Sequence, residues 1–104
     1  MAVTKPIWVL FKVPTPTPTR GETAKDLYDK RLTWITEAMR DSASSHGCLF
    51  HRCWYAADGA AFYAVACWAT RDGAGAFFDE WDIYDEEGEE AIYLEGDWGL
   101  VPVP

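Results

Sequence analysis

The side chains best suited to chemistry lie in residues 47–70, which read GCLFHRCWYAADGAAFYAVACWAT. This stretch holds all three cysteines and His51, one of the two histidines. An imidazole titrates near neutral pH and can take a proton from a phenol or an activated carbon. His51 is therefore the candidate catalytic acid or base. The alternative is a structural histidine whose ring nitrogens are satisfied by neighbouring groups.

The candidate substrate-binding residues are mostly aromatic: Trp68, Tyr55, Cys53, Phe62 and Trp8. Tryptophan and phenylalanine rings can stack on a flat aromatic molecule, and a tyrosine hydroxyl can hold a substrate oxygen. The alternative for all of them is ordinary packing in the core. Cys53 lies close to His51 in the sequence, so the two could form a nucleophile pair, or Cys53 could act as a small apolar filler.

An Asp-Gly pair at positions 58 and 59 separates two apolar runs and predicts a tight hairpin. With a two-residue turn, one face of the hairpin carries Leu49, His51, Cys53, Tyr55, Phe62, Ala64, Ala66 and Trp68. The other face carries Phe50, Arg52, Trp54, Tyr63, Val65 and Cys67. This second face is bulkier and is predicted to pack beneath helices. Alanines on the first face leave room opposite Cys53 and His51, which predicts a small-molecule pocket between sheet and helices or between two sheets.

The segments around the hairpin predict further strands and helices. Residues 7–13 place apolar side chains on both faces of a strand, as in a strand that is buried on both sides. The Pro-Thr segment 14–19 is predicted as a stiff loop. A helix is predicted to start near Thr23, which fits a capping pattern with Asp26, and its apolar stripe continues to Met39. The rest of the chain is predicted as a helix over residues 72–84, an acidic loop over 85–90 and a strand over 91–101.

The resulting order, β-α-β-β-α-β, is that of a ferredoxin-like domain of the α+β class. The 104 residues are enough for one such domain, covering 1–104. Right-handed crossovers would give an antiparallel sheet with both helices on one face. The other face then needs a second sheet, usually from another subunit, so we expect a homodimer.

Composition and charge limit the classes of partner. The net charge of −8 argues against nucleic acid, because phosphate contacts need Lys and Arg. Residues 72–104 hold eleven acids and no Lys or Arg, which predicts a solvated acidic face or a surface that meets a basic partner. The apolar runs are too short to span a membrane. Free thiols and a first segment unlike a secretory signal lead us to expect a cytoplasmic protein.

The sequence offers no recognised site for a metal or a cofactor. The three cysteines and two histidines lack zinc spacing, and the acidic run 85–90 lacks the register of a calcium loop. Glycine-rich nucleotide motifs are also missing. Any catalysis is therefore expected to use acid–base groups and an apolar pocket alone.

One segment resembles a known superfamily. The residues from Ala64 to Asp72, read with Ala76-Phe77-Phe78-Asp79-Glu80-Trp81, resemble the dimeric α/β-barrel superfamily, and look most like antibiotic biosynthesis monooxygenase-like proteins. In that family a strand ending in tryptophan runs into a helix with an Ala-Phe pair. The resemblance implies a ferredoxin-like fold and a homodimer. It also implies that Trp68 lines the cavity.

The superfamily also contains muconolactone isomerases, aromatic polyketide cyclases and haem-degrading monooxygenases. The haem-degrading members bind iron through a histidine on the second helix. This chain has no histidine there, because His46 and His51 both precede Trp68. Haem degradation is therefore disfavoured.

These observations predict a small cofactor-independent biosynthetic enzyme that acts on a hydrophobic, aromatic or polyketide-like molecule. The reaction would be oxygenation, as in a monooxygenase, or the work of a cyclase or an isomerase. One alternative is a non-catalytic binding or accessory protein that uses the same pocket. The other is an acidic protein-interaction module that uses the surface 79–97 or the Pro-Thr loop.

Overall fold

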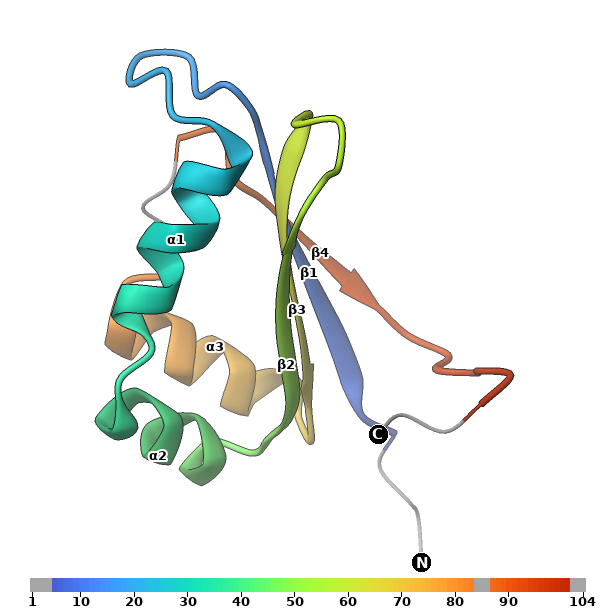
Figure 1. The fold of residues 1–104 in the computed structure, drawn as a ribbon. Helices are drawn as coiled ribbons and strands as arrows, with labels where there is room; N and C mark the ends of the chain where they lie inside the picture. Colours follow the sequence, from blue (N-terminus) through green and yellow to red (C-terminus); the bar gives the residue numbers. More distant parts are fainter. Residues whose placement is uncertain (1–4, 84–86, 102–104) are drawn as a thin grey trace, which may run out of the picture.

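The computed structural model describes residues 5–83 and 87–101 and shows a four-stranded antiparallel sheet with helices on one face (Figure 1). The elements along the chain are β1 (Ile7–Pro14), α1 (Ala24–Trp34), α2 (Glu37–Ser45), β2 (Cys48–Tyr55), β3 (Ala61–Trp68), α3 (Arg71–Trp81) and β4 (Glu90–Leu94). The strands lie in the order β2-β3-β1-β4. This arrangement confirms the predicted α+β, ferredoxin-like fold.

The first predicted helix is divided into two. α1 ends at Trp34, and α2 starts after Thr36, whose hydroxyl accepts a hydrogen bond from the Met39 amide at 3.2 Å. A threonine side chain that binds the backbone in this way caps a helix start and favours a break in the preceding one. The predicted helix is therefore interrupted after Trp34, although Met39 at the end of the predicted stripe still packs against the core. Arg31 is buried, while the neighbouring Leu32 is half exposed.

The helix starts depend on threonine caps. The predicted capping pair at α1 is confirmed: the Thr23 hydroxyl accepts from the Asp26 amide at 3.1 Å, and Asp26 accepts from the Thr23 amide at 3.0 Å. At α3 the cap is Thr70, whose hydroxyl accepts a hydrogen bond from the Gly73 amide at 3.0 Å. The helix therefore begins at Arg71, one residue before the predicted start at residue 72.

The end of the chain differs from the prediction. α3 stops at Trp81, where Asp82 adopts a left-handed φ of 50°, and residue 84 lies outside the described residues. β4 covers Glu90–Leu94 rather than 91–101. After β4 the chain leaves the sheet and runs away from the body of the molecule (Figure 1). The glycines in this stretch are consistent with its early departure from the sheet.

The core lies between the sheet and the helices. β1 alternates buried and partly buried residues along its length, as expected of a strand covered more fully on one face. Its buried side chains, Val9, Phe11 and Val13, pack with residues of β3 and the helices. The other core residues include Leu27, Phe62, Ala64, Ala66, Trp68, Ala74, Phe77, Phe78 and Ile83.

The hairpin pairing is close to the predicted one. Cys53 faces Ala64 and His51 faces Ala66, as expected. A bulge between Cys48 and Phe50 places Cys48, rather than Leu49, opposite Trp68. The last backbone bond before the turn joins the Ala56 amide to the Ala61 carbonyl at 2.9 Å, so the loop is longer than two residues.

The assignment of the two hairpin faces was wrong. The helices cover the face with the alanines, where Phe62, Ala64, Ala66 and Trp68 are all buried. The bulkier face, with Phe50, Trp54 and Val65, is open in the single chain, and Trp54 is 47% exposed. The physical reason is packing: small side chains on the sheet leave room for the large rings of α3.

The Pro-Thr loop and the acidic loop meet. Glu87 accepts hydrogen bonds from the Thr19 amide at 2.9 Å and from the Thr19 hydroxyl at 3.0 Å. These bonds lower the pKa of the Glu87 carboxyl. Residues 85 and 86 of the predicted acidic loop lie outside the described residues. An interaction role for the surface 79–97 stays a prediction.

Candidate functional site

A pocket lies between the sheet and the helices. On the sheet side it is bounded by Ala64, Ala66 and Trp68, and on the helix side by Arg31 and Trp34, among others. Its enclosed volume is about 90 Å³. This is small beside the roughly 300–1,000 Å³ of common ligand pockets. A ligand of several rings therefore needs the surrounding side chains to move apart.

The opening of the pocket is marked by lining residues that solvent reaches. Trp34, Ile35 and Met39 are only half-buried, and Arg40 is exposed. All four belong to the junction of α1 and α2, which lies opposite the edge strand β2 (Figure 1). The divided helix thus provides an entrance that one continuous helix would not.

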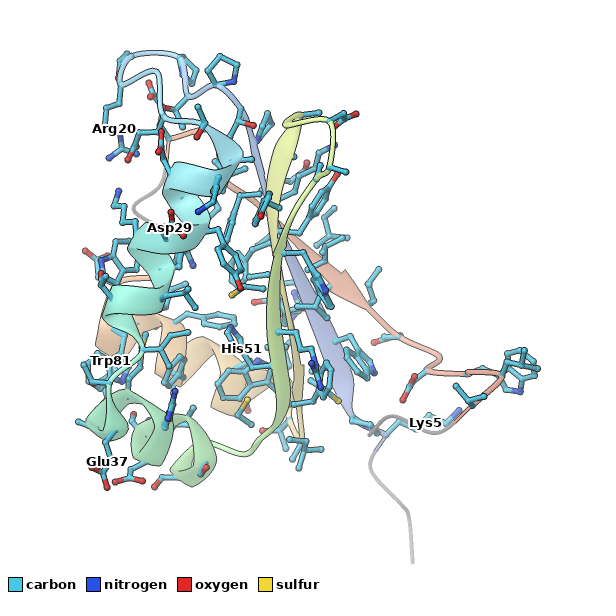
Figure 2. The ribbon with its side chains drawn as sticks, in the orientation of Figure 1. Lys5, Arg20, Asp29, Glu37, His51 and Trp81 are labelled. Atoms are coloured by element: carbon cyan, nitrogen blue, oxygen red, sulfur yellow. The ribbon has the colours of Figure 1, made fainter. Side chains whose placement is uncertain are left out.

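His51 projects from β2 toward the helices and lines the pocket (Figure 2). Its Nε2 lies 3.7 Å from the Cys53 Sγ. Surrounding protein atoms disfavour the imidazolium and lower the pKa of His51, and the nearby charge of Arg31 lowers this pKa further. Solvent still reaches the side chain, so its desolvation is partial. The neutral imidazole, which can accept a proton, is favoured at neutral pH.

Cys53 also lines the pocket, beside His51. Burial raises the pKa of the Cys53 thiol, against the smaller opposing effect of the Arg31 charge. The thiolate is the nucleophilic form, so a raised pKa disfavours nucleophilic catalysis. The geometry therefore gives Cys53 the role of a small apolar wall residue next to His51.

Trp68 forms the end of the pocket nearest α3. The residue is 1% exposed, and its ring centroid lies 5.1 Å from that of Phe77 and 5.5 Å from that of Phe78. Its indole Nε1 is buried and meets no acceptor among the described residues. A buried donor without a partner costs about 1–3 kcal/mol unless water or a ligand satisfies it. An acceptor that reached this nitrogen would remove that cost.

Three predicted substrate-binding residues lie away from this pocket. Tyr55 packs against Tyr28, with ring centroids 5.1 Å apart. Phe62 is fully buried in the core. Trp8 lies on the open face of the sheet, where its ring centroid is 5.4 Å from that of Phe50. Along a strand, alternate residues face opposite sides of the sheet, and Trp8 has the parity of the open face.

Arg31 was missed as a pocket residue. It is 8% exposed and lines the pocket from α1. The sequence does contain a signal for it: position 31 lies four residues after Leu27 and three after Tyr28, inside the apolar stripe. A charged residue in that position requires a partner. The partner is Glu89, whose Oε1 lies 2.5 Å from Arg31 Nη2.

Within residues 5–83 and 87–101, no group of three or more His, Cys, Asp or Glu side chains is placed to hold a metal ion. No helix in the described part of the chain has the length and apolar character required to cross a membrane.

Comparison with known proteins gives matches among solved structures alone. No protein-family model matches the chain, and no curated protein sequence matches it. A monooxygenase from the gene ActVA-Orf6 of Streptomyces coelicolor, solved in complex with nanaomycin D, has a TM-score of 0.67 at 13% identity, over 96% of this chain and 95% of that chain.

Two further structures are similar over most of their length. Rv0793 from Mycobacterium tuberculosis has a TM-score of 0.61 at 12% identity, over 92% of this chain and 99% of that one. A dimeric ferredoxin-like protein from an uncultured marine organism has a TM-score of 0.57 at 11% identity, over 94% of each chain. The chain therefore has the ferredoxin-like fold of these proteins, which confirms the resemblance at the level of the fold.

Proposed function

We propose that this protein is a small enzyme that binds a hydrophobic aromatic molecule in the pocket beneath its helices and uses His51 to remove a proton from it. The observation that carries the proposal is a histidine with a lowered pKa at the wall of an otherwise largely apolar pocket. A base that is neutral at the working pH can accept a proton from a phenol or an activated carbon.

Oxygenation is the reaction class we favour. The fold match to a monooxygenase solved with nanaomycin D supports this choice over cyclisation and isomerisation. A deprotonated phenolic substrate can react with dioxygen directly. One methylene carbon then becomes a carbonyl, one oxygen atom enters the product and the other leaves as water. This balance requires no additional reductant.

A homodimer is part of the same proposal. The open face of the sheet exposes large apolar side chains, including Trp54 at 47% and Leu94 at 43%. Such a surface is costly in water, and a second copy of the sheet would cover it. The similarity to a dimeric ferredoxin-like protein supports this arrangement. Light scattering that finds a monomer at micromolar concentration would remove this part of the proposal.

The function can be tested with a defined phenolic substrate, 1,8-dihydroxy-9-anthrone, under air. We expect the protein to accelerate oxygen uptake and formation of the anthraquinone above the spontaneous rate. His51→Ala should lower the protein-dependent rate by about 10²–10⁴-fold, the usual contribution of a general base. Cys67→Ala is the matched control and should retain activity, because Cys67 does not line the pocket. Equal rates for His51→Ala and the unmodified chain would refute the role of His51.

A binding protein without turnover is the second candidate. The described residues provide His51 with a thiol partner, Cys53, and with no carboxylate to orient its ring. Catalytic histidines usually have such an orienting group. If the anthrone binds the pocket but oxygen uptake stays at the spontaneous rate, this second function is correct.

A further inference from the structure

Arg31 is the most deeply buried charged residue that lines the pocket. Its Cζ lies 5.1 Å from the ring centroid of Trp34 and 5.4 Å from that of Phe62, so the guanidinium contacts two aromatic side chains. One end of it, Nη2, is bound to Glu89. The side chain therefore has a fixed position, set by two ring contacts and an ion pair.

A second part of the guanidinium remains unsatisfied. Arg31 Nε is buried and has no hydrogen-bond partner among the described residues. Arginine can only donate, so the missing partner must be an acceptor. Trp68 Nε1 is in the same condition, and both residues line the same pocket. Both donors belong to residues that line the pocket, whereas Trp8 Nε1, a further buried donor without an acceptor, lies on the open face of the sheet.

The charged residues that line the pocket also favour a ligand with an acceptor oxygen. The pocket's positively charged lining residues are Arg31 and Arg40, and no described Asp or Glu lines it, although the whole chain has a net charge of −8. The positive charge of Arg31 acts on two other residues of the pocket, since it lowers the pKa of both His51 and Cys53. Because Glu89 balances that charge, a neutral acceptor oxygen fits as well as an anionic one.

We propose that Arg31 is the specificity-determining residue of the pocket, and that its Nε–H donates a hydrogen bond to a carbonyl oxygen of the aromatic ligand. Glu89 is a positioning residue that holds the guanidinium in place. This inference rests on the proposed function, in that the ligand must occupy the pocket beneath the helices. It narrows the ligand class from aromatic hydrocarbons in general to aromatic ketones and quinones.

A matched pair of small probes can test the proposal. 1-Indanone and indane have nearly the same shape, and the main difference between them is the carbonyl. Each is titrated into the ¹⁵N-labelled full chain, and the Arg31 Nε–H and Trp68 indole signals are followed by NMR. We expect 1-indanone to bind about 3- to 10-fold more tightly than indane, the usual effect of one hydrogen bond, and to move the Arg31 Nε–H signal downfield.

The outcomes separate this inference from the proposed function. If neither probe moves any pocket signal, the pocket does not accept aromatic ligands and both proposals fail. If both probes move the signals of Trp68 and Trp34 with equal affinity and the Arg31 signal stays still, the pocket is confirmed and the role of Arg31 is overturned.

Variants of the chain provide a further test in the same titration with 1-indanone and indane. Arg31→Lys keeps the charge but loses the Nε donor, so the advantage of 1-indanone over indane should disappear while indane affinity is retained. Arg52→Lys is the control, because Arg52 is exposed on the open face of the sheet and does not line the pocket, and it should keep the advantage. Glu89→Gln should weaken 1-indanone binding less than Arg31→Lys does. A circular dichroism spectrum shows whether each variant is folded, and the titration of the unmodified chain decides the proposal if Arg31→Lys is not.

Discussion

The two faces of the sheet are both rich in apolar residues, yet they differ sharply in burial. On the helix-covered face, Phe62 is 0% and Trp68 is 1% exposed, whereas Trp54 on the open face is 47% exposed. The covered face contains alanines at 64 and 66, which leave room for the rings of α3. In this sheet the face with the small side chains, rather than the bulkier one, is the face that the helices cover. This also explains why the pocket lies there.

The largest expected effect comes from replacing a tryptophan on each face. Trp68→Ala should lower the free energy of unfolding by about 3–5 kcal/mol, because it opens a cavity in the core. Trp54→Ala should lower it by less than about 1 kcal/mol at high dilution, where a dimer would dissociate. Urea denaturation followed by circular dichroism measures both values. Equal losses would contradict the assignment of the two faces.

The next largest expected effect is on the proposed association of two copies of the chain through the open face. Leu10 lies on β1 opposite Val65 of β3 and Ile92 of β4, in the middle of this face. Leu10→Glu should weaken dimer formation at least about 100-fold, which is about 2.7 kcal/mol, because the partner sheet would bury an unpaired charge. Analytical ultracentrifugation measures the dissociation constant. Ala57→Glu on the exposed hairpin loop is the control and should leave it unchanged.

A third test addresses how α3 is seated against α2. A Cβ at Gly73 would collide with the His46 carbonyl oxygen, whereas a Cβ at Gly75 would meet no atom within 4 Å. Gly73→Ala should therefore destabilise the fold by about 1–3 kcal/mol. Gly75→Ala should stabilise it by about 0.5–1 kcal/mol, since alanine is the better helix former. Thermal unfolding of the two variants measures the difference. A gain in stability from Gly73→Ala would show that the helices are not in close contact.

The smallest expected effect is the pH dependence that His51 gives to the free energy of unfolding. Its pKa in the folded state is lowered, so the unfolded chain binds more protons once the pH drops below the unfolded value of about 6.5. Stability should therefore be constant above this value and fall as the pH decreases toward the folded pKa. The slope should be shallow because solvent reaches the side chain. His51→Gln should remove this part of the slope in urea denaturation series, and an unaltered slope would contradict the lowered pKa.

Much of the fold could be predicted from local signals. The Asp-Gly turn, the apolar strand 7–13 and the Thr23–Asp26 cap each have a short-range physical cause, and each appears in the structure. The break between α1 and α2 depends on one threonine, Thr36, which also fits an uninterrupted helix. The early end of β4 depends on where the chain leaves its pairing with β1, and no single residue determines this.

The candidate site was harder to predict. The predicted register placed His51 and Cys53 opposite the alanines correctly, because the observed loop, although longer than two residues, is centred on the same Asp-Gly pair. Which face the helices cover depends on how the whole chain packs, so the bulkier face was assigned to them wrongly. Arg31 was missed because its partner, Glu89, is distant in the sequence, and a charged residue within an apolar stripe resembles an ordinary interruption.

The six tryptophans allow one direct measurement of the central claim, that the ligand pocket lies on the helix-covered face. Each tryptophan gives its own indole N–H signal in a ¹H–¹⁵N spectrum, and titration with 1-indanone shows which of them lie near the bound ligand. We expect shifts at Trp34 and Trp68, which line the pocket, and none at Trp8 or Trp54, which lie on the open face. Shifts at Trp8 and Trp54 with Trp34 and Trp68 unmoved would contradict this claim.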